Sequence, residues 1–96
     1  MSTLMIVIRK VSIEKVKKQL RKLPRHIVDK LQFWVTEVES KGVEEVRKQP
    51  GWHDEPLKGD RAGQRSIRLS KGYRAFYEIV NNETVVSVIE VNKHDY

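Results

Sequence analysis

The feature that most constrains the fold is a succession of three β-prone segments in the last third of the chain. They cover residues 65–70, 73–80 and 84–91. Asn81 and Asn82 separate the second segment from the third, and asparagine tolerates the positive φ of a tight hairpin turn. Strands joined by turns this short pair with opposite polarity, so this part of the chain is expected to form an antiparallel sheet.

Two amphipathic helical segments precede the sheet. Ser12 can cap the first, and Pro24 both stops it and stands in the first turn of the second, which Gly42 ends. The apolar positions at helical spacing are Ile13, Val16, Leu20 and Leu23 in the first segment, and Ile27, Leu31, Trp34, Val35 and Val38 in the second. Before them, residues 4–8 form an apolar run that is far too short to span a membrane and indicates a strand.

The predicted order is therefore β-α-α-β-β-β. It indicates an α+β fold in which a helical hairpin packs on one face of an antiparallel, twisted sheet. No repeat, low-complexity tract or linker divides the sequence, so residues 1–96 are interpreted as a single domain. The polar, turn-rich residues 52–63 are expected to form a loop.

Charge and cysteine content narrow the class of function. The net charge of +6 favours a polyanionic partner or an acidic protein over a neutral small molecule. The absence of cysteine excludes disulfides, thiol catalysis and cysteine-ligated zinc, and it fits the reducing cytoplasm. We therefore expect a cytoplasmic protein with no membrane partner.

The strongest local charge bias lies between residues 58 and 74, where Asp60 is the one acidic residue. The basic residues there are Lys58, Arg61, Arg65, Arg68, Lys71 and Arg74. Strand alternation puts Arg68 on a face with Ser66, and Arg74 on a face with Phe76 and Glu78. Arginines on adjacent strands can converge on one phosphate. The alternative interpretation is that Arg68 and Arg74 pair with Glu78 or Glu90.

Histidines and a tyrosine supply candidate groups for proton transfer. His94 ends the last predicted strand beside Tyr96, and His53 precedes two carboxylates in the loop. The spacing of His53, Asp54 and Glu55 matches no compact metal motif, and the sequence has no glycine-rich phosphate loop and no nucleophile elbow. The remaining candidate groups, which are arginine, histidine and tyrosine side chains, need neither metal nor cofactor. Arginine, histidine and tyrosine suffice for RNA, because its 2′-hydroxyl is an internal nucleophile.

A family resemblance follows from these residues. It is carried by Leu57-Lys58-Gly59, Arg65-Ser66-Ile67-Arg68-Leu69, Gly72-Tyr73-Arg74, Tyr77 and Val88-Ile89-Glu90-Val91-Asn92-Lys93-His94. This pattern resembles the RelE branch of the RelE/ParE toxin superfamily, and the predicted element order matches that family along essentially the whole chain.

The resemblance implies a toxin of a type II toxin–antitoxin pair, held by a cognate antitoxin. Such a toxin enters the ribosomal A site and cleaves translated mRNA without a metal, by attack of the 2′-hydroxyl to leave a 2′,3′-cyclic phosphate. The catalytic residues it implies are Arg68, Arg74, His94 and Tyr96. We add His53 as a further candidate, and Lys58, Arg61, Arg65, Lys71 and Lys93 as candidate RNA-binding residues.

Ser66 departs from the family pattern, because the best-known RelE-like toxins have a second lysine there. The general base is then His94 or His53, as in the histidine-using HigB and YoeB branches. Two other functions remain open: a ParE-like DNA gyrase poison on the same fold, and a basic nucleic-acid-binding module that leaves RNA intact.

Overall fold

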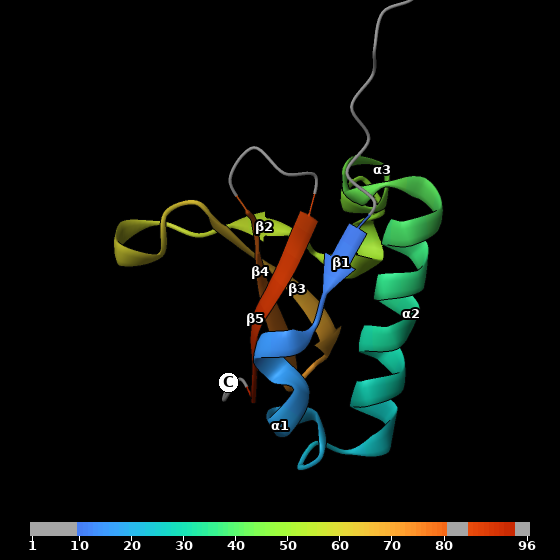
Figure 1. Cartoon of the computed structure of the whole chain (residues 1–96). Coiled ribbons are helices and arrows are strands. Elements are labelled where there is room, and N and C mark those ends of the chain that lie inside the picture. The colour runs from blue at the N-terminus through green and yellow to red at the C-terminus, as the bar shows by residue number, and fades with distance from the viewer. Residues whose placement is uncertain (1–9, 81–84, 94–96) are drawn as a thin grey trace, which may run out of the picture.

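The computed structural model describes residues 10–80 and 85–93, in which one long helix covers one face of a five-stranded sheet (Figure 1). In chain order the elements are β1 (Lys10–Ser12), the 3₁₀ turn η1 (Glu14–Val16), α1 (Lys17–Leu20), α2 (Arg25–Lys41), α3 (Val43–Arg47), η2 (Pro50–Trp52), β2 (Glu55–Pro56), η3 (Gly59–Arg61), β3 (Gln64–Ser70), β4 (Tyr73–Ile79) and β5 (Val85–Lys93). The predicted strand at residues 4–8 and the turn at Asn81 and Asn82 lie outside the described residues. The α+β class is confirmed.

The strands lie in the order β1-β5-β4-β3-β2. β3, β4 and β5 pair antiparallel, as the sequence predicted, but β1 pairs parallel with β5. The sheet is therefore mixed at this edge rather than antiparallel throughout. At the other edge, Glu55 and Pro56 of the predicted loop pair with Ser66 and Arg65 as the short strand β2. Proline is tolerated there because an edge strand leaves one side of its backbone unpaired.

The second helical segment has the predicted bounds, whereas the first is shorter than predicted. Gly42 ends α2 at φ 89°, and Pro24 precedes its first turn. The first segment begins as the 3₁₀ turn η1 and its α-helical part ends at Leu20, short of the predicted Leu23. Leu23 precedes a proline, whose ring disfavours the α conformation of the residue before it.

The side chain of Gln19 fixes α1 against the sheet. β1 pairs with residues 85–87 of β5 and then ends, which leaves the edge of β5 open further along. There the Gln19 amide accepts a hydrogen bond from Val91 N at 3.1 Å and donates one to Val91 O. One side chain thus replaces the backbone of a neighbouring strand.

The core lies between α2 and the sheet. The predicted stripe of α2 is buried, and the Trp34 ring packs at 5.0 Å from the Tyr77 ring of β4. The buried residues of the covered sheet face are Ile67, Leu69, Ala75, Tyr77, Val88 and Val91. Within the described ranges, no helix is long and apolar enough to cross a membrane.

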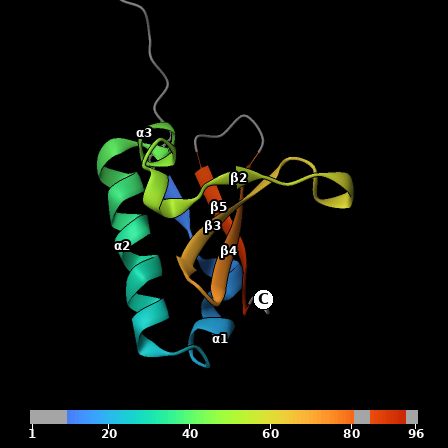
Figure 2. The same ribbon diagram turned by 180° about the vertical axis from the view of Figure 1, so that it is seen from behind.

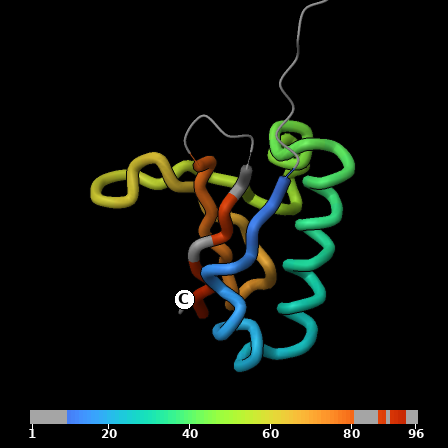
Figure 3. Tube along the Cα trace, in the orientation of Figure 1, coloured from blue at the N-terminus to red at the C-terminus, as the bar shows by residue number. Residues whose placement is uncertain are grey.

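In the part of the chain that the structure describes, no α-helix covers the opposite face of the sheet (Figure 1). Seen from both sides, the segment around η3 projects away from the body on the side opposite α2 (Figure 2). The Cα trace shows the same arm as a loop that leaves the sheet and returns into β3 (Figure 3). The open face and this arm carry most of the predicted basic cluster.

Candidate functional site

Two arginines stand directly opposite each other on the open sheet face. Arg68 of β3 is the register partner of Arg74 of β4, which in turn pairs with Asn92 of β5. Both arginines are half-buried. Like charges opposite each other on antiparallel strands destabilise a sheet, so this pair is an electrostatic cost that a bound anion would relieve.

The Arg74 guanidinium is held by a serine rather than by a carboxylate. Its Nη1 donates to Oγ of Ser66, 2.9 Å away, and Ser66 is only 2% exposed. Among the residues with described positions, neither Arg74 nor Arg68 forms an ion pair. Glu78 pairs instead with Lys15 at 3.8 Å and Glu90 with Arg61 at 2.8 Å. The carboxylates that the alternative interpretation assigned to the arginine pair are therefore engaged elsewhere.

Arg68 meets His53 at the edge of the sheet. Arg68 Nη1 lies 3.4 Å from Nε2 of His53. The Nε of Arg68 is buried and has no hydrogen-bond partner within the described part of the chain. A guanidinium has only donors, so an approach to Nε2 fits an imidazole that accepts there and carries its proton on Nδ1.

The backbone at His53 is strained. His53 has φ 45°, a left-handed conformation that no other described residue except glycine adopts. Its neighbours are fixed in the interior, because Trp52 is 4% exposed and the Asp54 side chain 1% exposed. Strained residues of this kind persist where the surrounding structure enforces them, often at functional sites. Here the two anchors turn the imidazole outward, toward Arg68.

Asp54 is the centre of a buried polar cluster on the helix-covered side. It accepts from Arg65 Nε and from Tyr77 Oη, each at 2.5 Å, and lies 3.9 Å from Arg47 Nε. Burial and the hydrogen bond to Asp54 raise the pKa of Tyr77, which stays protonated. For Arg65, desolvation lowers the pKa, but the hydrogen bond and charge of Asp54 outweigh it and the net pKa is raised. The cluster ties α3, β3 and β4 to the His53 segment.

Arg65 is therefore not brought to the open face with the other basic residues. It follows the opposite parity from Arg68 on β3 and is committed to Asp54. Asp54 likewise turns away from His53. No group of three or more histidine, aspartate or glutamate side chains in residues 10–80 and 85–93 is arranged to hold a metal ion.

Arg61 folds back from the projecting arm onto the sheet. Its guanidinium lies 4.3 Å from the centre of the Phe76 ring and donates to Gln64 Oε1 and Glu90 Oε1, each at 2.8 Å. Phe76 stands on the open face, in the row next to the arginine pair, where its register partners are Ser66 and Glu90.

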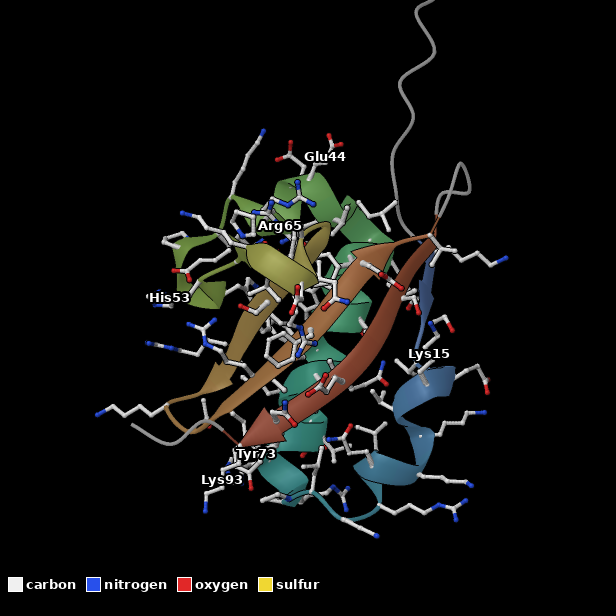
Figure 4. The ribbon with its side chains drawn as sticks, turned by 90° about the vertical axis from the view of Figure 1, so that its left-hand side faces the viewer. Lys15, Glu44, His53, Arg65, Tyr73 and Lys93 are labelled. Atoms are coloured by element: carbon white, nitrogen blue, oxygen red, sulfur yellow. The ribbon has the colours of Figure 1, made fainter. Side chains whose placement is uncertain are left out.

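The other predicted cations surround this face without contacting its centre. Lys58 is exposed on the arm, Lys71 in the turn between β3 and β4, and Lys93 at the end of β5. Viewed from the open side, Lys93 and Tyr73 mark one end of the sheet, while His53 and Lys15 lie at opposite edges (Figure 4). His94 and Tyr96 lie outside the described residues.

Sequence reasoning missed the supporting residues. Ser66 is a buried clamp for Arg74, and Tyr77 and Arg47 complete the Asp54 cluster. The alternation of β3 and β4 signals which side chains share a face, but no local pattern pairs Tyr77 with Asp54 across the loop.

The sequence matches a family profile over residues 14–95. The family is described as the ParE toxin of a type II toxin–antitoxin system, parDE. The match covers all the described elements except β1. No curated protein matches the sequence.

Solved structures of toxin–antitoxin proteins resemble this fold. A chain of the RelBE2 complex from Mycobacterium tuberculosis is 26% identical, with a TM-score of 0.61 over 92% of this chain and 100% of that one. The toxin RelE from E. coli, in a mutant form, is 28% identical, with a TM-score of 0.59 over 93% and 84%. A chain of the archaeal RelE–RelB complex from Pyrococcus horikoshii has a TM-score of 0.67 over 90% and 94% at 21% identity, which supports the fold alone.

Proposed function

The chain belongs to the ParE toxin family of type II toxin–antitoxin systems, and we propose that this toxin is a metal-independent endoribonuclease that cleaves translated mRNA on the ribosome. The observation that carries the proposal is the pair Arg68 and Arg74 on the open face, with His53 in contact with Arg68. A toxin that only bound a protein would have no evident need to hold two arginines face to face beside an imidazole.

The geometry supports separate chemical roles for the arginine pair and for Ser66. The scissile phosphate lies between Arg68 and Arg74. The hydrogen bonds that these arginines donate to the phosphoryl oxygens become stronger as negative charge builds up there. Ser66 keeps Arg74 in place without neutralising it, because a hydroxyl accepts a hydrogen bond but carries no charge. The preorganised guanidinium pair is thus available to the transition state.

The reaction is an internal displacement. The 2′-oxygen forms a bond to the adjacent phosphorus as the bond from phosphorus to the 5′-oxygen breaks, which leaves a 2′,3′-cyclic phosphate and a 5′-hydroxyl. Once Arg68 turns from His53 Nε2 to the phosphate, that nitrogen is free to take the proton from the 2′-hydroxyl. The 5′-oxygen leaves with a proton, for which the sequence offers His94 and Tyr96, both outside the described residues.

The proposal includes the partners that such a toxin requires. The similar RelBE2 and RelE–RelB structures are toxin–antitoxin complexes, which supports a cognate antitoxin for this chain. The net charge of +6 favours an acidic antitoxin segment and the ribosomal A site, where mRNA is presented in the cytoplasm. Co-purification with the product of the adjacent reading frame tests the antitoxin.

A second candidate function is inhibition of DNA gyrase. The ParE description of the matching family favours it, because ParE-like members of the superfamily are gyrase poisons. The two functions differ in their need for the arginine pair. The nuclease uses it for catalysis, whereas a gyrase poison requires no phosphate-directed catalytic centre. A supercoiling assay with purified gyrase, run beside the mRNA cleavage assay described next, distinguishes the two functions.

We expect Arg74→Ala to lower mRNA cleavage by about 100-fold or more, the effect of losing one donor to a developing oxyanion. Arg74→Lys keeps the charge but loses the planar fork, so it should recover only part of the activity. Cleavage is measured by primer extension on a message under translation in the presence of chelator, followed by analysis of the ends for a 2′,3′-cyclic phosphate.

Arg25→Ala is the matched control. Arg25 is exposed at the start of α2, where it pairs with Asp29 of its own helix. Its loss removes the same charge without touching the open face, so cleavage should be unchanged. Near-normal cleavage by Arg74→Ala, or loss of gyrase supercoiling with intact mRNA, would overturn the nuclease proposal.

A further inference from the structure

Phe76 occupies an unusual position for a phenyl ring. Its strand neighbours Ala75 and Tyr77 point into the core and are each 1% exposed. Phe76 has the opposite parity and stands on the open face, half-buried, between Ser66 and Glu90. The ring is therefore not needed to fill the core between α2 and the sheet.

The cover over this ring is a cation from the projecting arm. The Arg61 guanidinium lies on Phe76 and is held by Gln64 at the start of β3 and by Glu90 of β5. In the view of the open face, the η3 segment lies in front of the strands (Figure 4). Arginine stacked on an aromatic ring has the flat shape and electrostatics that also suit a nucleobase.

The ring is one step from the arginine pair. Phe76 and Arg74 are alternate residues of β4, so their side chains emerge on the same face about 7 Å apart along the strand. This spacing is comparable to that between the phosphate and the base of one nucleotide. A strand of RNA whose phosphate binds Arg68 and Arg74 would therefore bring one of its adjacent bases over Phe76.

We propose that Phe76 is a stacking platform for a nucleobase next to the scissile phosphate, and that Arg61 covers it until RNA displaces the guanidinium. This inference rests on the proposed ribonuclease function and assigns the same face a further binding site. The released Arg61 stays on its arm, where it can pair with a phosphate instead of Glu90.

The balance of interactions favours the exchange. The Arg61 and Glu90 side chains are 38% and 34% exposed, so their ion pair shifts an equilibrium by at most about fivefold. Stacking of a base on an aromatic ring contributes about fivefold to more than a hundredfold. The exchange also removes the contact of Arg61 with the ring, about two- to fivefold at an exposed site, and its hydrogen bond to Gln64. The released guanidinium regains an ion pair with a phosphate, so a base can replace it on the ring.

The test compares RNA with and without a base. The probe is a fluorescein-labelled RNA hexanucleotide in which fluorine replaces each 2′-hydroxyl, which removes the nucleophile, together with versions that carry one abasic site at each position. Binding is measured by fluorescence anisotropy at fixed low salt. The readout is the affinity ratio of the intact to the weakest abasic probe, in which the phosphate contacts cancel.

We expect a ratio of about tenfold for the unaltered protein, within the range for one stacked base. Phe76→Leu should lower it to about one, and Phe76→Trp should keep or raise it. Phe33→Leu is the matched control, because Phe33 is a 53% exposed phenyl on α2, away from the open face. It should leave the ratio unchanged. Arg61→Gln should raise the ratio, because the ring is then uncovered.

An unchanged ratio in Phe76→Leu overturns the platform, and a lower ratio in Arg61→Gln overturns the displacement of Arg61 by the base. A fold defect is detected by circular dichroism, and Phe76→Trp then decides the result. Failure here is distinct from failure of the proposed function. If the ratio does not depend on Phe76 while Arg74→Ala still abolishes cleavage, the ribonuclease stands and the platform falls. If the ratio depends on Phe76 while Arg74→Ala cleaves normally, Phe76 binds a base but the ribonuclease proposal fails.

Discussion

His53 has a backbone conformation that its residue type disfavours. Left-handed φ costs a residue other than glycine about 1 kcal/mol or more. The conformation is imposed by buried neighbours, Trp52 on one side and Asp54 on the other. Its effect is to direct the imidazole to Arg68, so the strain is coupled to the geometry of the candidate site.

This coupling separates stability from activity at one position. We expect His53→Gly to be more stable than His53→Ala by about 1 kcal/mol, because only glycine adopts φ 45° without strain. Both variants remove the imidazole, so both should lose cleavage to the same extent. Urea unfolding and primer extension measure the two properties. Equal stability of the two variants, or full activity in either, contradicts this account of His53.

Between elements, the Asp54 cluster connects the His53 segment to the body of the protein. Arg47 comes from α3, Arg65 from β3 and Tyr77 from β4, and all three face one carboxylate. Tyr77 also packs on Trp34, so the polar cluster continues directly into the apolar core. A change in this cluster should alter both stability and the position of the imidazole.

The raised pKa of Tyr77 makes this contribution dependent on pH. Because the folded state holds the proton more tightly, the stabilisation is complete below the unfolded pKa of about 10 and is lost as the pH rises above it. We expect Tyr77→Phe to cost about 1–3 kcal/mol at pH 7, since Asp54 loses a donor. The difference in unfolding free energy between this variant and the unaltered protein should then decrease by about 1.4 kcal/mol per pH unit above 10.

Urea unfolding between pH 7 and pH 11 measures that gap. The lysines titrate in both proteins and cancel in the difference. Tyr73→Phe is the matched control for loss of a tyrosine hydroxyl, because Tyr73 is on the same strand but outside the cluster. A gap that widens with pH would show that Tyr77 does not keep its proton in the folded state.

The same elements show what local sequence could predict. Period-two alternation correctly put Arg68 with Ser66 and Arg74 with Phe76, and helical spacing gave the buried stripe of α2. Alternation also put Arg65 on the other face, yet charge density alone grouped it with the RNA-binding residues. Its partner Asp54 and the Gln19 clasp on Val91 are tertiary contacts. Nothing in the spacing of residues along the chain specifies them.

Across the whole molecule, charge position matters more than charge total. The basic residues Lys15, Lys17 and Lys18 are exposed around η1 and α1, beside the β1 and β5 edge. Arg68 and Arg74 lie across the sheet from them on the open face. A general polyanion-binding surface would use both groups equally, whereas a phosphate site on the open face would depend on the arginines.

The salt dependence of RNA binding distinguishes these two cases. Each phosphate neutralised on a single strand adds about 0.7 to the slope of log affinity against log salt. Because both arginines face the same phosphate, Arg68→Gln and Arg74→Gln should each lower the slope by up to about that amount for the uncleavable hexanucleotide. Lys18→Gln removes the same unit of charge from an exposed residue of α1, and it should leave the slope nearly unchanged. Equal slopes in all three variants would mean that RNA binding depends on the net charge of +6 as a whole. The open face would then not be a specific phosphate-binding site.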